Sequence, residues 1–500
     1  MEQGYVTLGL EPKNVFMIFE DISRIARPTG NPKNQEGIIS WIAKTLDAAG
    51  INTLKDYAGN LYAYKKASVG CENVEGILLQ AHVDMVCAPN EDIFPLKLMV
   101  DGDYLRAKGS SCGLDNGMGI ALAMALLMDG KYSHGPLEAA FTLNEDTDCF
   151  GAINMEEGYV RSKYMISLDD ESWGKICIGS AGAEAYTHSL TFMPVPIKSS
   201  VFYELKVSGL TGGHSGYSIE KGQANAIKLC AEVLKGISEV CLPLQIINFE
   251  AGVADNAIPY ECVVSFILDN TKIGEKDVKD IVEALASDIK KRFADTDPAM
   301  KIVIGTDNSK VETMLAESKA MNAMSVETSD SLIKCILACP NGPLAYHLTE
   351  DGKKIIQTSS NLAIIKTEGG KVSLRTLSRS SVKSELENTV EDIKKTFKRF
   401  CGEYQFTNHS SALCWEPDWN SDFLKIAKEV FRKQEGYNPE VYAPHCYMEG
   451  AYFVKIHKVL PIAIGPQIDG AHTVGEKVLI PTVNKCYNIV KSIISSLTVR

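Results

Sequence analysis

Short apolar runs alternate with helical stretches through the first part of this 500-residue chain. Between residue 15 and about residue 195, runs such as GILLQA, LEAAFTL and YMISL are separated by segments with helical spacing, such as EGIISWIAKTLDAAG. This alternation is typical of an α/β layer with a mixed, mostly parallel sheet between helices. Functional residues in such sheets gather outside the carboxyl ends of the strands, so the residues that follow each apolar run are the first candidates for a site.

The pattern changes twice along the chain, and these changes predict its domains. From residue 198, longer alternating strands such as VFYELKVSGL and KVSLRTLS are mixed with helices, which is typical of an α+β region. After about residue 415 the helix-then-buried-strand pattern returns. We therefore predict a catalytic domain in two segments, residues 1–197 and 416–500, interrupted by an inserted α+β domain, residues 198–415, that serves as a lid.

Charge and composition exclude several classes of partner. The net charge of -12 is spread along the chain without a long block, which argues against nucleic-acid binding. The N-terminal segment lacks the pattern of a signal peptide, and the longest apolar run, GMGIALAMALLM, is shorter than the roughly 20 residues that span a bilayer. The 14 cysteines contain no C-x-x-C pair, so we expect buried free thiols and a cytoplasmic protein that contacts no membrane.

Two of the candidate ligands come early in the chain. The run LLQAHVDMV leads into His82 and Asp84, which share one face of an extended chain, so that Asp84 can accept the imidazole N–H of His82 that faces away from a metal. Asp115 lies in the turn GSSCGLDNGMG before a helix, where a plain N-cap is the alternative. Three glycines of this turn, Gly113, Gly117 and Gly119, favour close backbone approach around the carboxylate.

The remaining candidates follow later strands. LEAAFTLNED ends in adjacent carboxylates, Glu145 and Asp146, which point to opposite sides, so that one can hold a metal while the other addresses a water beside it. Asp169 ends the run YMISLDD, and His472 lies in the loop after VLPIAIG. Each motif alone has an ordinary structural explanation. Together, two imidazoles and three carboxylates suit two divalent ions, with zinc the first choice and manganese or cobalt as substitutes.

These segments resemble the di-zinc metallopeptidase family of aminoacylases and carboxypeptidases, and most closely its aminoacyl-histidine (Xaa-His) dipeptidase branch. The segments IARPTGN, GLTGGHSG, ADNAIP, SRSSVKSE and GPQIDGAHTVGEKV extend the resemblance over nearly the whole chain. It implies that His82 and Asp169 bind one zinc, Asp146 and His472 the other, and that Asp115 bridges them. The family usually has glutamate at the position of Asp146, and the run NEDTDCF departs from its pattern.

The resemblance also implies a mechanism and places His214 at the position of the family's lid histidine, and we predict roles for Arg379, Asn256 and Glu449 from the chemistry of their side chains. A zinc-bridging water gives its proton to Glu145, the general base, and attacks the peptide carbonyl. His214 donates to the oxyanion, and Arg379 clamps the substrate carboxylate, with a structural salt bridge as the alternative. Asn256 contributes a lid hydrogen bond and Glu449 recognises the substrate amine. The other histidines, including His445, are expected to be structural.

The predicted function is hydrolysis of dipeptides, of the Xaa-His type and broader, by a homodimer that pairs through the inserted domain. Two alternatives remain open. One is an aminoacylase or carboxypeptidase-like amidohydrolase acting on N-acyl amino acids. The other is a catalytically inactive dimeric binding protein, an idea motivated by the NEDTDCF run.

Overall fold

The computed structural model describes residues 4–196, 201–240, 243–268, 274–306, 322–349 and 352–499. Contacts between residues divide the chain into two compact units. Unit 1 comprises Met1–Gly179, Trp415–Ala443 and Met448–Arg500, and unit 2 comprises Ser180–Cys414 and Pro444–Tyr447.

The first division between the units falls earlier than the sequence pattern suggests. The expected boundary at residues 197 and 198 lies outside the described residues, whereas the contacts divide the chain after Gly179. The reason is strand β9 (Gly182–Thr191), which pairs along its length with two strands of unit 2. The short segment Pro444–Tyr447 also belongs to unit 2, a return of the chain that the sequence pattern does not signal.

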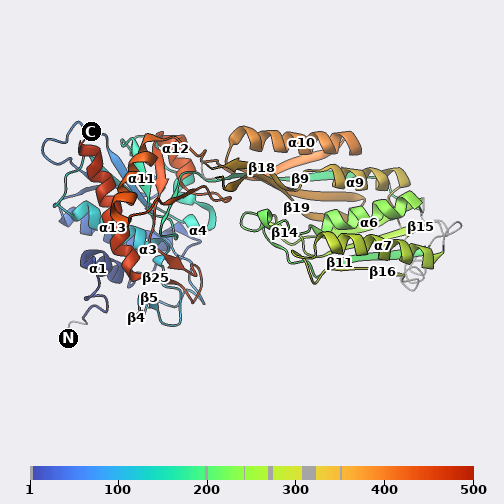
Figure 1. The fold of residues 1–500 in the computed structure, drawn as a ribbon, viewed down its shortest axis with the longest axis horizontal. Helices are drawn as coiled ribbons and strands as arrows, with labels where there is room; N and C mark the ends of the chain where they lie inside the picture. The colour runs from blue at the N-terminus through green and yellow to red at the C-terminus, as the bar shows by residue number, and fades with distance from the viewer. Residues whose placement is uncertain are drawn as a thin grey trace. The chain divides into compact units, whose positions relative to one another are not determined.

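Eight strands of unit 1 form one mixed sheet (Figure 1). In spatial order they are β1 (Asn52–Lys55), β2 (Leu61–Lys65), β6 (Leu137–Thr142), β3 (Ile77–His82), β7 (Tyr164–Ser167), β23 (Leu460–Ala463), β8 (Lys175–Cys177) and β22 (Glu440–Tyr442). The pairs β6–β3, β3–β7, β7–β23 and β8–β22 are parallel. Strands β3 and β6 are buried at every position, which is why their sequences are continuous apolar runs. The carboxyl ends of β6, β3, β7 and β23 therefore meet at one edge.

Five helices of unit 1 contribute buried side chains to the hydrophobic core that includes this sheet. They are α1 (Lys13–Ile22), α2 (Glu36–Ala48), α3 (Leu114–Met128), α11 (Asp422–Glu435) and α13 (Ile480–Ser496). The shorter helices are α4 (Glu145–Asp148), α5 (Phe150–Ile153) and α12 (Gly450–His457), with 3-10 turns at Pro32–Gln35 and Leu497–Val499. A small sheet follows the order β24 (Ile468–Asp469), β25 (Lys477–Leu479), β5 (Tyr104–Ala107), β4 (Leu98–Asp101). The apolar run noted above forms α3, and among the described residues no helix is long and apolar enough to cross a membrane.

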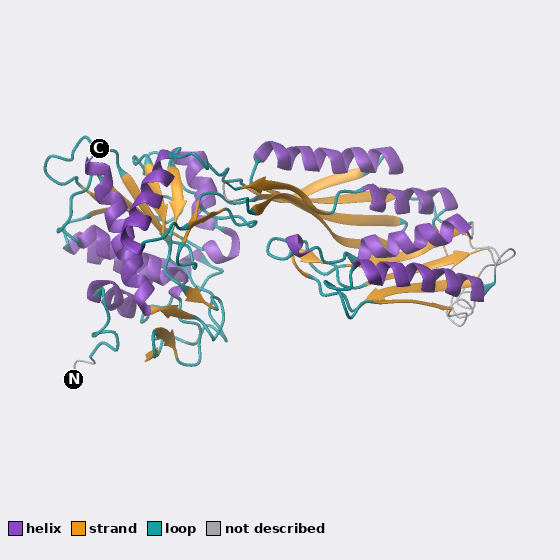
Figure 2. Ribbon diagram, in the orientation of Figure 1, coloured by secondary structure: helices purple, strands orange, loops and turns teal. Residues whose placement is uncertain are grey.

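Unit 2 is built on a nine-stranded antiparallel sheet with helices along it (Figure 2). In spatial order the strands are β16 (Lys301–Thr306), β11 (Val201–Ser208), β15 (Cys262–Leu268), β13 (Leu244–Ala251), β19 (Lys354–Glu368), β20 (Lys371–Ser380), β9 and β21 (Gln405–Ala412), and β18 (Gly342–Leu348) also pairs with β19. The helices are α6 (Ala226–Val240), α7 (Glu275–Arg292), α9 (Val326–Ala338) and α10 (Lys383–Cys401), with a 3-10 turn at Ile219–Lys221. Two short ladders pair β10 (Val195–Pro196) with β17 (Asn322–Ala323) and β12 (Gly213–His214) with β14 (Ala257–Ile258).

The strands of unit 2 alternate because the helices cover one face of the sheet. In β11, Tyr203, Leu205 and Val207 join the core beneath the helices, whereas Lys206 is exposed on the opposite face. The α/β and α+β character predicted for the two regions is confirmed. The described cysteines are all free thiols, as expected.

The core of unit 2 contains a histidine whose burial predicts how the free energy of unfolding depends on pH. His188 is 1% exposed and stacks on Phe397 with ring centroids 4.3 Å apart. Burial, helped by the charge of Lys394, lowers its pKa to about 4. Because the pKa of His188 is lower in the folded than in the unfolded chain, the unfolded chain takes up a proton at a higher pH. The free energy of unfolding that neutral His188 contributes is therefore fully present above pH 6.5 and is lost as the pH falls towards 4. Between pH 7 and pH 5 the wild type should lose about 2 kcal/mol of unfolding free energy that His188→Phe does not lose. Denaturant unfolding at both pH values measures this, and equal losses would contradict it.

Candidate metal centre and active site

Three neighbouring strands of the unit 1 sheet, β6, β3 and β7, deliver polar side chains at their carboxyl ends. Strand β3 ends at His82, β6 is followed by Glu145 and Asp146, and β7 is followed by Asp169. His472 lies in the loop after β24. Because three of these strands are parallel neighbours, their carboxyl ends bring residues from distant parts of the sequence together.

Asp115 lies between the two imidazoles. Its Oδ1 is 2.9 Å from Nε2 of His82, and its Oδ2 is 2.9 Å from Nε2 of His472. Each imidazole also faces a second carboxylate: Asp169 Oδ1 lies 3.6 Å from His82 Nε2, and Asp146 Oδ1 lies 2.8 Å from His472 Nε2. The five residues therefore form two sets, one imidazole and one carboxylate in each, joined by the carboxylate of Asp115.

The donor atoms fit divalent cations. One possible ligand atom from each of His82, Asp115 and Asp146 lies within 4.8 Å of the other two. Asp146 Oδ2 is buried without a hydrogen-bond partner among the described residues. Hydrogen bonds to Asp115 and Asp146 raise the pKa of His472 to about 11, so the carboxylates strongly favour positive charge at this point. Buried carboxylates with imidazole neighbours are the donor set that zinc and similar ions prefer.

Asp84 connects the His82 ring to the loop that carries the candidate base. Its Oδ1 lies 3.3 Å from Nδ1 of His82. The same carboxylate accepts the backbone N–H groups of Glu145 at 2.9 Å and Asp146 at 3.2 Å. Asp84 thus fixes the imidazole and the loop together, as carboxylates behind metal-bound histidines do.

Glu145 opens the short helix α4. Burial raises the pKa of its carboxyl well above the usual range, and the neighbouring charges of Asp169 and Glu449 act in the same direction. A carboxylate with a raised pKa is suited to accept and return a proton near neutral pH. The loop is well anchored despite its unusual sequence, because the Asn144 side chain accepts the N–H of Gly30 at 2.6 Å.

Glu449 is 1% exposed and is held by two strands of the sheet. Its Oε2 accepts hydrogen bonds from Gln80 Nε2 at 2.8 Å and from Thr142 Oγ1 at 2.6 Å. Its Oε1 is buried without a partner among the described residues. The structure therefore places Glu449 in unit 1, beside the ends of β3 and β6, with one oxygen still free to accept a hydrogen bond.

The other predicted residues, His214, Asn256 and Arg379, all belong to unit 2. The backbone N–H of Ser215 donates to the Asn256 carbonyl at 2.7 Å, which ties the His214 segment to the Asn256 turn. Burial and the charge of Arg379 lower the pKa of His214, so this imidazole is neutral at pH 7. The three residues thus form a second group within unit 2.

Arg379 is 4% exposed, and its Nε and Nη1 atoms are buried without an acceptor among the described residues. The alternative of a structural salt bridge finds no support, because Arg379 pairs with none of the described carboxylates. Ser359 lies directly opposite it on β19, and Ser359 Oγ is 2.7 Å from Nε2 of His445. Burial and the charge of Arg379 lower the pKa of His445 to about 3. The result is a buried positive site lined by neutral hydrogen-bonding groups.

The sequence reasoning missed four residues around these groups. His445 was expected to be structural, but segment Pro444–Tyr447 carries it to Arg379, and no local pattern signals such a return. Ser359, Arg27 and Glu476 were not singled out. Arg27 and Glu476 stand inside motifs that carry the resemblance, IARPTGN and HTVGE, so a closer reading of those motifs would have found them.

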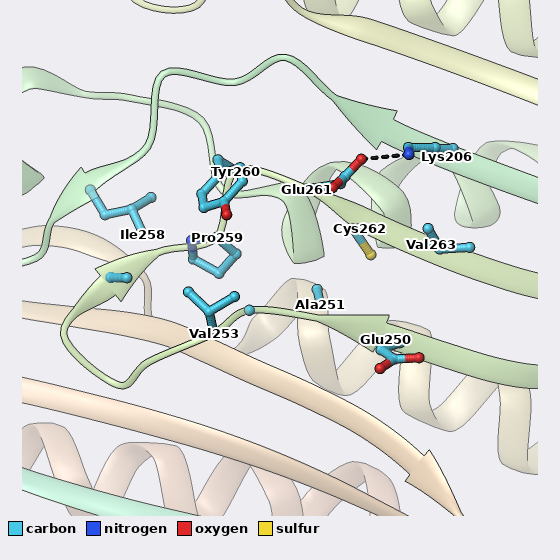
Figure 3. A pocket seen from close by; sticks show the side chains of 12 residues that line it. Lys206, Glu250, Ala251, Val253, Ile258, Pro259, Tyr260, Glu261, Cys262 and Val263 are labelled. Atoms are coloured by element: carbon cyan, nitrogen blue, oxygen red, sulfur yellow. Dashed lines mark ion pairs between the residues drawn. The ribbon is translucent and has the colours of Figure 1, made fainter.

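A separate hollow of about 240 Å³ lies in unit 2. Figure 3 shows its lining of Val253, Pro259 and Tyr260, with Lys206 and Glu261 paired at 2.5 Å. The ion pair satisfies both charges, and none of the predicted site residues lines the hollow. It therefore carries no catalytic assignment.

The fold and the strand-end cluster define a metal-dependent hydrolase, and comparisons with known proteins identify its family. The sequence profile of peptidase family M20/M25/M40 matches residues 78–496, so the chain belongs to this family. This confirms the family resemblance found in the sequence.

Two relatives match nearly the whole chain. The cytosol non-specific dipeptidase of Escherichia coli (strain K12) is 28% identical over 497 residues, which cover 98% of each protein. The crystal structure of aminoacylhistidine dipeptidase from Vibrio alginolyticus superposes with a TM-score of 0.89 at 25% identity, covering 99% of this chain and 98% of that one. A tripeptidase from Staphylococcus aureus shares the fold, with a TM-score of 0.55 at 14% identity over 98% of this chain and 100% of that one.

Proposed function

We propose that this protein is a dipeptidase that binds two zinc ions, or manganese or cobalt in their place. The observation that carries the proposal is Asp115, whose two carboxylate oxygens each lie 2.9 Å from a different imidazole. One carboxylate shared by two imidazole–carboxylate sets is the arrangement that a pair of ions requires. The names of the Escherichia coli and Vibrio alginolyticus relatives support dipeptides as the substrates.

His82 and Asp169 would hold one ion, His472 and Asp146 the other, and Asp115 both. When bound, the ions polarise the peptide carbonyl and lower the pKa of water at the site. Glu145 takes the proton from the attacking water and passes it to the leaving amine. Asp84 holds the His82 ring and the Glu145 backbone in fixed positions relative to each other during the reaction.

The two ends of a dipeptide carry opposite charges, and each has a candidate partner. The free Oε1 of Glu449 is suited to accept a hydrogen bond from the substrate ammonium. The guanidinium of Arg379 is suited to the carboxylate, with Ser359 and His445 as neutral neighbours. His214 and Asn256 are proposed as the oxyanion donor and a further substrate hydrogen-bonding group.

A substrate panel on zinc-reconstituted protein tests the proposal. We expect Ala-His and other free dipeptides to be cleaved and N-acetyl-histidine to be left intact. Cleavage of N-acetyl-histidine instead would favour the aminoacylase alternative, and no cleavage of either would favour the inactive binding protein.

A homodimer formed through unit 2 and a cytoplasmic location belong to the same proposal. Sedimentation of the full chain tests the dimer, and the name of the Escherichia coli relative supports the location.

Removal of the Arg379 guanidinium should discriminate between substrates. Arg379→Ala is expected to lower kcat/KM for free dipeptides by about 10- to 100-fold, because a charge-assisted hydrogen bond to the substrate carboxylate is lost. The same dipeptides with an amidated C-terminus should be affected little. Lys371→Ala, at the exposed start of the same strand, is the matched control and should change neither rate. Equal losses on free and amidated substrates would remove the clamp.

A further inference from the structure

A buried carboxylate holds the turn that carries Asp115. Glu476 is 2% exposed, and its two oxygens accept four consecutive backbone N–H groups. Oε2 accepts those of Cys112 and Gly113 at 2.6 and 2.8 Å, and Oε1 accepts those of Leu114 and Asp115 at 2.8 and 3.1 Å. The N–H groups of Leu114 and Asp115 belong to the first turn of α3, where N–H groups have no partner within the helix, and those of Cys112 and Gly113 directly precede it.

Glu476 also belongs to the loop that carries His472. The loop is tightly turned: His472 has φ 64°, a conformation that side chains other than glycine rarely adopt, and the Glu476 N–H donates to the Thr473 carbonyl at 3.2 Å. The position of the Glu476 carboxylate is therefore coupled to that of the His472 ring. Through Glu476, the His472 loop and the Asp115 turn are joined.

A buried guanidinium holds the same turn from another direction. Arg27 is 1% exposed, and its Nη2 donates to the Gly113 carbonyl at 2.5 Å. Its Nη1 donates to the carbonyls of Val83 and Asp84 at 2.9 and 2.7 Å. Arg27 thus joins the Asp115 turn to the end of the strand that carries His82.

The glycines of the turn make room for this guanidinium. A Cβ atom built on Gly113 or on Gly117 would lie 2.6 Å from Nη2 of Arg27, and one on Gly119 would meet the Asn116 side chain. The sequence predicted that these glycines allow the backbone to come close to the Asp115 carboxylate. In the structure they allow it to come close to the side chains of Arg27 and Asn116. Neither Arg27 nor Glu476 forms an ion pair with a side chain of the described residues. Both charged groups bind backbone groups instead.

We propose that Arg27 and Glu476 are positioning residues and that each of them supports a different one of the two metal positions. Glu476 fixes Asp115 relative to His472, and Arg27 fixes Asp115 relative to His82. Loss of either contact should weaken one metal position before the other, because Asp115 contributes a different oxygen to each. The inference rests on the proposed two-metal function, but it concerns metal binding rather than turnover.

Titration of the metal-free full chain with Co²⁺, followed by calorimetry and visible absorption, tests this division. The wild type should bind two equivalents. In Glu476→Gln an amide NH₂ group faces backbone N–H groups, so we expect one of the two affinities to fall by about 10- to 100-fold. Arg27→Lys keeps the charge but loses the forked geometry, and should weaken the other position by a similar factor.

Double variants assign each effect to a position. His472→Ala removes one position and leaves that of His82. Adding Glu476→Gln to it should not change the remaining Co²⁺ affinity, whereas adding Arg27→Lys should lower it. If Arg27→Lys does not fold, Gly117→Ala serves the same purpose, because its methyl group would displace the guanidinium.

Glu138→Gln is the matched structural control. Glu138 is a buried carboxylate that accepts the N–H groups of Arg161 and Ser162, but it lies at the far end of β6 from the site. Its variant should lower the melting temperature and keep both Co²⁺ affinities. If Glu476→Gln behaves in the same way, the inference is overturned. A wild type that binds fewer than two ions would instead refute the proposed function on which the inference rests.

Discussion

Glu145→Gln is expected to keep both metal ions and to lose about 10²- to 10⁴-fold in kcat on dipeptides. The amide has the same shape as the carboxyl group but cannot accept the proton of the attacking water. The loop should stay in place, because Asp84 holds it through the backbone N–H groups of Glu145 and Asp146. Initial rates with Ala-His, together with the metal content of the purified variant, measure the two halves of this expectation.

The matched control for this variant is Asp148→Asn. Asp148 is an exposed carboxylate of the same short helix and accepts a hydrogen bond from Asn144 at 2.8 Å. Its variant should retain nearly the full kcat. Near-normal turnover in Glu145→Gln would end the assignment of the general base, and loss of metal from that variant would show a structural role instead.

Removal of the metal ions should abolish dipeptide hydrolysis, with a loss of about 10³-fold or more, because Lewis-acid stabilisation is worth several kcal/mol. Return of Zn²⁺, Mn²⁺ or Co²⁺ should restore the activity. The melting temperature should fall on chelation as well, since ions that bind only the folded chain stabilise it. We expect this stabilisation because the carboxylates of Asp115, Asp146 and Asp169 lie close together and repel one another when no cation is bound.

Chelation of the Glu145→Gln variant separates stability from catalysis. That variant should lose the same number of degrees on chelation as the wild type, although it has little activity to lose. Hydrolysis that persists in the metal-free wild type would contradict the whole mechanism, whatever happens to the melting temperature.

Local sequence patterns were enough to predict most residues of the candidate cluster. His82, Glu145 and Asp169 each follow a buried apolar strand, and parallel strands place their carboxyl ends together, so their proximity could be predicted without a structure. Asp146 stands where the family that the chain resembles usually has glutamate. The shorter side chain nevertheless reaches to 2.8 Å from His472, because the backbone of its loop is held by Asp84.

Other features could not be read from local patterns. Strand β9 has the ordinary sequence of a strand, and only its partners place it in unit 2 rather than in unit 1. His445 has no motif around it, and its relevance comes from four residues, Pro444–Tyr447, that belong to unit 2 although the segments on either side belong to unit 1. Hydrogen bonds between residues far apart in sequence leave no periodicity behind, so a pattern search does not detect them.

The sequence by itself determined the α/β and α+β regions, the family, and the polar residues that end each strand, because burial periodicity and strand direction are local properties. Only the tertiary structure showed that Asp115 shares its two oxygens between two imidazoles. It also showed that Arg27 and Glu476 hold the Asp115 turn through backbone groups. Backbone carbonyls and N–H groups are the same in every residue, so a side chain that binds them cannot be paired with its partner until the chain is folded.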